Sequence, residues 1–152
     1  MRKLMLAMTL LAMFALAACG GGADEEPAAA APSAQEAIAQ VLKVTAHDLY
    51  YNEPDNLTNP PVWTVNAGEV FEVDLDNQGG LQHNWAIVKP GAEVPVPFDP
   101  AANADLLLWD AGLVDPGQSE AAQFTVDDPG TYTIICTVAG HYPSMQGQLV
   151  VQ

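Results

Sequence analysis

The sequence predicts an all-β domain, and three observations support this prediction. Apolar and polar side chains alternate along several short segments, such as residues 42–47 and 71–76, which is the period of a strand with one buried face. Turn-forming residues separate these segments at 66–68, 77–80, 115–117 and 128–130. Residues 41–152, which carry this pattern, are enough for one domain. Short strands with regular turns are typical of a β-sandwich or a barrel.

The first segment, residues 1–18, has the pattern of an export signal. Arg2 and Lys3 precede an apolar run that ends at Ala18 and is too short for a membrane span. The sequence around Cys19 resembles a bacterial lipoprotein signal, so we expect Cys19 to be lipidated and to begin the mature chain. An ordinary secretory signal cut nearby is the alternative. Several acyl chains would anchor the protein stably at the outer face of the cell membrane.

Residues 19–40 are expected to form a flexible acidic tether, because Ala, Pro, Gly and acidic residues dominate them. The domain that follows should be mostly strands. Asp99 followed by Pro100 is typical of a helix start, so we expect a short helix through about Leu107 in a loop between strands. The expected strands cover residues 42–47, 71–76, 83–87, 123–127, 132–136 and 145–151.

The charge of the chain excludes some classes of partner. Beyond residue 18, Lys43 and Lys89 are the only basic residues against 19 acidic ones, so the formal net charge of residues 19–152 is −17. Such a chain is not expected to bind nucleic acid or an anionic membrane surface. Its charge favours a basic protein partner, although solubility alone would also explain it.

A set of soft-metal ligands lies near the end of the chain. Cys136, His141 and Met145 fall within ten residues, and His83 lies upstream. The period of two directs His83, Cys136 and Met145 toward the expected core at strand ends, while His141 lies in the loop between Cys136 and Met145. One Cys, two His and a weakly bound Met form the ligand set of a blue copper site.

Simpler interpretations of these residues remain open. Cys136 could be an inert buried thiol, and Met145 could be ordinary core filling. Zinc also binds one Cys and two His, but it takes a strong fourth ligand or a water, and Met serves as neither. Asn84 is expected beside the ligands, where it would bond the Cys136 thiolate or pin the two ligand loops together. His47 points away from the expected core, so we exclude it from the site.

The motif Cys-x4-His-x3-Met, with His83 and Asn84 upstream, resembles the azurin-type ligand set of the cupredoxins, the type 1 blue copper family. Segments 82–85, 102–105, 128–132, 135–137 and 140–142 resemble the membrane-bound auracyanin branch of that family. The resemblance implies a Greek-key β-sandwich of about eight strands, with one copper ion per chain that cycles between Cu(I) and Cu(II) at one end. It also makes the backbone carbonyl of Gln82 a candidate for a weak copper contact.

The resemblance further implies one-electron transport between a quinol-oxidising membrane complex and a basic c-type cytochrome or a photosynthetic reaction centre. We expect a monomer. The alternative is a copper-delivery lipoprotein, which the absence of Met-rich or His-rich tracts disfavours. An enzyme is not expected, because copper oxidases and reductases need a second metal or an open substrate position. His141 would be the electron port, in a docking patch completed by Tyr142, Pro143, Val138 and Leu81.

Overall fold

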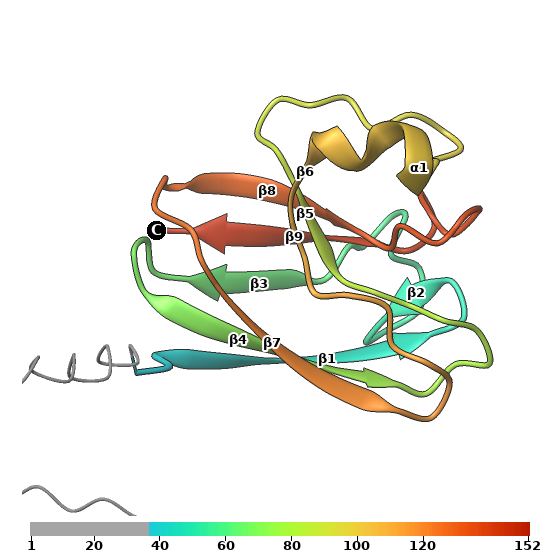
Figure 1. The fold of residues 1–152 in the computed structure, drawn as a ribbon, viewed down its shortest axis with the longest axis horizontal. Coiled ribbons are helices and arrows are strands. Elements are labelled where there is room, and N and C mark those ends of the chain that lie inside the picture. The colour runs from blue at the N-terminus through green and yellow to red at the C-terminus, as the bar shows by residue number, and fades with distance from the viewer. Residues whose placement is uncertain (1–36) are drawn as a thin grey trace, which may run out of the picture. The chain divides into compact units, whose positions relative to one another are not determined.

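The computed structural model describes residues 37–152, which form two β-sheets that face each other (Figure 1). One sheet has the strand order β2-β1-β4-β7 and the other has the order β3-β9-β8-β5-β6. The predicted all-β sandwich is confirmed, and the described residues contain nine strands where about eight were expected. The strands are β1 (Gln40–His47), β2 (Tyr50–Tyr51), β3 (Val62–Val65), β4 (Val70–Asn77), β5 (Ala86–Val88), β6 (Leu107–Asp110), β7 (Ser119–Thr125), β8 (Gly130–Ile135) and β9 (Gln146–Val151).

The expected export signal, Cys19 and most of the expected tether lie outside the described residues. β1 begins at Gln40, the last residue that we assigned to the tether. Among the described residues, none of the helices has the length and hydropathy that crossing a bilayer requires.

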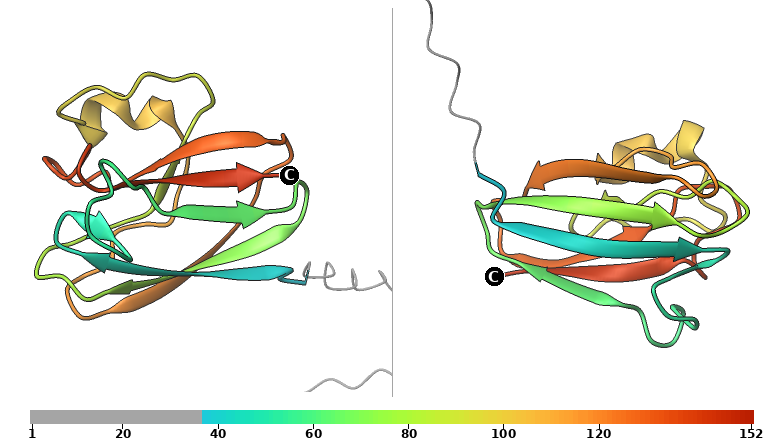
Figure 2. Two further views of the ribbon diagram at one scale, coloured as in Figure 1. Left: turned by 180° about the vertical axis from the view of Figure 1, so that it is seen from behind. Right: turned by 90° about the horizontal axis from the view of Figure 1, so that it is seen from below.

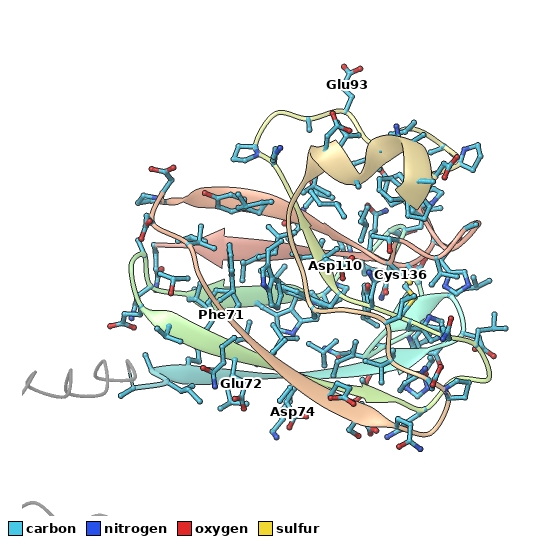
Figure 3. All side chains as sticks on the ribbon, viewed as in Figure 1. Phe71, Glu72, Asp74, Glu93, Asp110 and Cys136 are labelled. Atoms are coloured by element: carbon cyan, nitrogen blue, oxygen red, sulfur yellow. The ribbon has the colours of Figure 1, made fainter. Side chains whose placement is uncertain are left out.

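The core lies between the two sheets, and alternation along the strands produces it. On β4, Phe71, Val73 and Leu75 are buried, while Glu72 and Asp74 point out of the opposite face of the sheet (Figure 3). β1 alternates in the same way, as predicted. Burying each large apolar side chain contributes about 1.5–3 kcal/mol. This energy fixes which face of each strand meets the other sheet, because a shift of one residue would expose the whole apolar set.

The two ends of the sandwich hold different parts of the chain. β1 begins at Gln40, and it pairs in parallel with β4. β8 runs toward Cys136 and is followed by the return strand β9, which ends near the C-terminus. The start of β1 and the C-terminus lie at one end, while Cys136 lies at the other (Figures 2 and 3). The segment that precedes β1 therefore joins the domain at the end remote from Cys136.

The predicted short helix is present in the connection between β5 and β6. It begins as α1 (Pro100–Asn103), and the side chain of Asp99 caps it by accepting a hydrogen bond from the N–H of Ala101. A single 3-10 turn, η1 (Ala104–Leu106), completes it. The helical segment lies over the outer face of the sheet that contains β5 and β8 (Figure 1). A second apolar cluster of buried residues comprises Ala86, Val88, Phe98 and Ile135.

Candidate metal centre

Sheet register brings the segments of His83 and Cys136 side by side. β5 and β8 are antiparallel, and Ala86 lies opposite Ile135. The residues just before Ala86 therefore lie beside the residues just after Ile135. His83 is held further by an isolated bridge to Val114, with N···O distances of 3.2 and 2.8 Å in the two directions. The backbone of both ligand candidates is thus held by hydrogen bonds at the end of one sheet.

The loop between Cys136 and Met145 is closed by hydrogen bonds between its own backbone groups. The N–H of His141 donates to the carbonyl of Val138 at 3.0 Å, and the N–H of Met145 donates to the carbonyl of His141 at 2.9 Å. The N–H of Cys136 donates to the carbonyl of Met145 at 3.2 Å. Gly140 permits the turn because its φ of 83° lies in the left-handed region that favours glycine. These bonds hold Cys136, His141 and Met145 as one unit.

The donor atoms of three predicted ligands lie close together and away from solvent. Those of His83, Cys136 and His141 all lie within 4.8 Å of one another, and all three residues are buried. Sγ of Cys136 lies 3.8 Å from Nδ1 of His83 and 3.4 Å from Nδ1 of His141. The two imidazole centroids are 4.9 Å apart. Met145 is fully buried, and its backbone contacts place it at the same end of the sandwich.

These distances fit a metal ion bound between the three donors. Bonds of about 2.3 Å to sulfur and about 2.0 Å to nitrogen, separated by 120°, place the two donor atoms roughly 3.7 Å apart. The observed separations from Cys136 Sγ, 3.8 Å to His83 and 3.4 Å to His141, match this spacing. One thiolate and two imidazoles with a weak Met as the fourth ligand favour copper over zinc.

Burial sets the protonation of the ligands before a metal binds. It raises the pKa of the Cys136 thiol to about 11, although the backbone N–H groups of Asn84 and Val138 act in the opposite direction. Burial is also the main cause that lowers the pKa of His83 and of His141. Lowered pKa values favour the uncharged imidazoles, which is the form that binds a metal. The thiol must lose its proton before it can bind.

Asn84 joins the two ligand-bearing segments, which is one of the two roles expected for it. Its Oδ1 accepts a hydrogen bond from the N–H of Thr137 at 2.7 Å, and its Nδ2 donates to Oγ1 of Thr137 at 2.8 Å. Nδ2 also donates to Oδ1 of Asp110 at 2.8 Å. The hydroxyl of Tyr51 donates to the backbone carbonyl of Asn84 at 2.5 Å. Asn84 thus fixes the spacing between the segment of His83 and that of Cys136.

The other residues predicted for the site differ in their exposure to solvent and in their contacts. His141 retains 4% exposure while His83 has none, so His141 is the imidazole nearer to solvent. Leu81 is 50% exposed, whereas the side chain of Tyr142 packs partly against the second apolar cluster. Pro143 and Val138 are half-buried. Gln82 is exposed, and its side-chain amide donates to Asp115.

His47 lies outside the group of metal donors, as expected, and its ring stacks on that of Tyr50. Sequence reasoning missed its neighbour Asp48, whose carboxylate reaches His83 at 3.4 Å. The available signal was the pair Gly79-Gly80 shortly before a ligand His, which we interpreted only as a turn. Such a pair also indicates close approach of other atoms.

Comparison with known proteins gives a consistent family assignment. A family model described as copper binding proteins, plastocyanin/azurin family, matches residues 41–152. Auracyanin-A of Chloroflexus aurantiacus is 31% identical over 164 residues, covering 99% of this chain and 97% of that protein. Auracyanin-B of the same organism is 38% identical over 101 residues, covering 56% of this chain and 43% of that protein.

Solved structures agree with this assignment. An auracyanin B structure has a TM-score of 0.62 at 31% identity, covering 77% of this chain and 91% of that one. Auracyanin A, described as a "blue" copper protein from Chloroflexus aurantiacus, has a TM-score of 0.56 at 26% identity. The match covers 74% of this chain and 98% of the auracyanin A chain. An azurin from Methylomonas sp. strain J, at 21% identity and a TM-score of 0.59, shares the fold. The match covers 75% of this chain and 98% of the azurin chain. With its copper ligands His83, Cys136, His141 and Met145 arranged as in a type 1 site, this chain belongs to the copper-binding plastocyanin/azurin family.

Proposed function

We propose that the protein is a mobile one-electron carrier with a type 1 copper centre. The observation that carries this proposal is the buried group of His83, Cys136 and His141, whose donor atoms lie within 4.8 Å of one another. When bound there, copper supplies the one-electron redox chemistry. We infer no enzymatic activity, because the ligand end offers buried donors rather than an open substrate position.

The surroundings of the ligands suit electron transfer because they resist rearrangement. The loop from Cys136 to Met145 is closed by backbone hydrogen bonds, and Asn84 ties it to the segment of His83. Ligands held in this way keep nearly the same positions in both oxidation states, so the reorganisation energy of electron transfer is small. The N–H groups of Asn84 and Val138 favour the thiolate form of Cys136, the form that binds copper.

The proposed setting is the outer face of the cell membrane, with Cys19 as the lipid anchor. The described domain begins at the end remote from Cys136 (Figures 2 and 3). A tether attached at that end would leave the ligand end free to meet partners. The similarity to auracyanin A, a blue copper protein of a photosynthetic bacterium, supports a role in photosynthetic electron transport.

The proposed partners are a quinol-oxidising membrane complex and a basic c-type cytochrome or a reaction centre. The formal net charge of −17 over residues 19–152 favours attraction of a basic protein. Contact would occur around His141, with Leu81 as the most exposed of the five proposed docking residues. A small apolar surface of this kind suits a weak, transient redox encounter. We propose that the chain itself acts as a monomer.

Stopped-flow mixing of the reduced, copper-loaded chain with an oxidised basic c-type cytochrome tests this function. We expect transfer of one electron per chain at a rate that falls as salt rises, because salt screens the attraction. Leu81→Ala should slow the reaction more than Leu57→Ala, a control at another exposed leucine of 61% exposure. Failure to exchange electrons with any cytochrome, combined with rapid copper loss to a chelator, would favour copper delivery instead.

A further inference from the structure

The carboxylate of Asp48 connects the end of β1 to the segment that leads to His83. Asp48 directly follows β1, and its Oδ1 accepts hydrogen bonds from the N–H groups of Gly80 at 2.9 Å and Leu81 at 3.3 Å. The bond from Gly80 is the main cause that lowers the pKa of this carboxyl below its usual value. An exposed aspartate carries a negative charge at neutral pH, so Asp48 places this charge beside a segment that ends in a copper ligand.

The same oxygen faces the imidazole of His83 from the side opposite the metal centre. Oδ1 of Asp48 lies 3.4 Å from Nε2 of His83, while Nδ1 of His83 lies 3.8 Å from Sγ of Cys136. A carboxylate only accepts hydrogen bonds, so Nε2 must carry the proton for this contact to be favourable. In a neutral imidazole only one ring nitrogen carries a proton, so Nδ1 is then left with the lone pair that a metal needs.

Gly79 makes this contact sterically feasible. A Cβ atom at position 79 would lie 2.6 Å from Oδ1 of Asp48 and 2.8 Å from Nε2 of His83. Both distances are shorter than any ordinary contact to carbon, so a larger residue would displace the carboxylate, the imidazole or both. The side chain of His83 is fully buried and that of Asp48 is 54% exposed. The pair thus links a buried ligand directly to a charge at the surface.

We propose that Asp48 is a positioning residue for the copper ligand His83 and that its charge lowers the reduction potential of the centre. The carboxylate holds the imidazole with Nδ1 directed at the metal. A negative charge beside a ligand stabilises Cu(II) relative to Cu(I), because the oxidised ion carries the larger positive charge. Hydrogen-bonded partners of this kind commonly fix the orientation and basicity of ligating histidines. This inference rests on the proposed copper-dependent function, but the imidazole orientation can be tested without metal.

Two substitutions in the full chain separate the two parts of the proposal. Asp48→Asn removes the charge and keeps an oxygen that can accept from Nε2–H, whereas Asp48→Ala removes both. Asp128→Asn is the matched control, because it removes an exposed carboxylate from the turn before β8, at the end remote from Cys136. The first readout is the His83 tautomer in the metal-free chain, from long-range proton–nitrogen NMR correlations. The second is the equilibrium between oxidised and reduced copper-loaded chain and a redox mediator.

We expect Asp48→Asn to keep the Nε2–H tautomer and to shift the redox equilibrium toward the reduced form by about three- to tenfold, given partial screening by water. Asp48→Ala should give the same shift and also a mixture of tautomers, while Asp128→Asn should change neither. An unchanged equilibrium in Asp48→Asn would refute the role of the charge. A wild-type tautomer in Asp48→Ala would refute the positioning role. If the wild-type chain bound no copper, the proposed function would fail while the NMR result still decided the Asp48–His83 contact.

Discussion

Replacing Asn84 by Ala should cost stability as well as weaken the copper site. The substitution leaves the N–H of Thr137, a residue with 5% exposure, without the acceptor that lies 2.7 Å away. A buried donor without a partner costs about 1–3 kcal/mol. Loss of the two bonds from Nδ2 to Thr137 and Asp110 adds roughly 1 kcal/mol, since Asp110 is exposed. We therefore expect the free energy of unfolding to fall by about 2–4 kcal/mol.

Guanidinium unfolding of the metal-free chain, followed by tryptophan fluorescence, measures this loss without any contribution from metal binding. A fall of about 3 kcal/mol should lower Tm by roughly 12 °C in a domain of this size. Asn59→Ala is the matched control, because Asn59 is exposed and its side chain makes one long bond of 3.3 Å to Asp55. That control should stay within about 0.5 kcal/mol of wild type. A loss in Asn84→Ala no larger than in the control would refute the view that Asn84 joins the two ligand segments.

Three further predictions follow from burial and close contacts. Because burial raises the pKa of Cys136 to about 11, above its value in the unfolded chain, the metal-free protein should lose on the order of 2 kcal/mol as pH rises from about 9 through 11. Denaturant midpoints at both pH values should show a larger loss in wild type than in Cys136→Ala, and the difference between the two chains measures the thiol. A loss remains in Cys136→Ala because burial also raises the pKa of Tyr51. Gly147→Ala should cost about 1–3 kcal/mol, since its Cβ would lie 2.5 Å from the Trp63 ring; Gly130→Ala, with its nearest contact at 3.7 Å, is the control for the same unfolding assay. Met145→Leu should keep stability within about 1.5 kcal/mol and change the reduction potential, because the axial ligand tunes it; an unchanged potential would argue against Met145 as a ligand.

Much of the fold could be predicted because apolar and polar residues alternate cleanly along several of its strands. β1 and β4 have one apolar and one polar face, and the helix start at Asp99 has a local signature. Three strands, β2, β3 and β6, were missed because β2 has two residues and the others have four each, too few for a clear period. Trp63 on β3 is buried, yet the glycine that makes room for its ring is Gly147, on the neighbouring strand β9. A contact between such distant positions leaves no local pattern.

In the same way, some residues of the candidate site can be identified from their spacing along the chain, and others only from strand pairing. Cys136, His141 and Met145 share one loop, so their spacing along the chain is enough to identify the ligand set. Asp48 belongs to a turn 35 residues before His83 and reaches it only because β1 and β4 are paired. The choice of Thr137 as the partner of Asn84 also depends on the register of β5 against β8.

The central claim is that His83, Cys136, His141 and Met145 hold one copper ion as a type 1 centre. Copper content and the visible absorption of the oxidised, copper-loaded chain test it most directly, with Cys136→Ser as the comparison. We predict one copper per chain and an intense blue colour that disappears in Cys136→Ser, because the colour requires the copper–thiolate bond. A wild-type chain that binds one copper and stays colourless would contradict the claim.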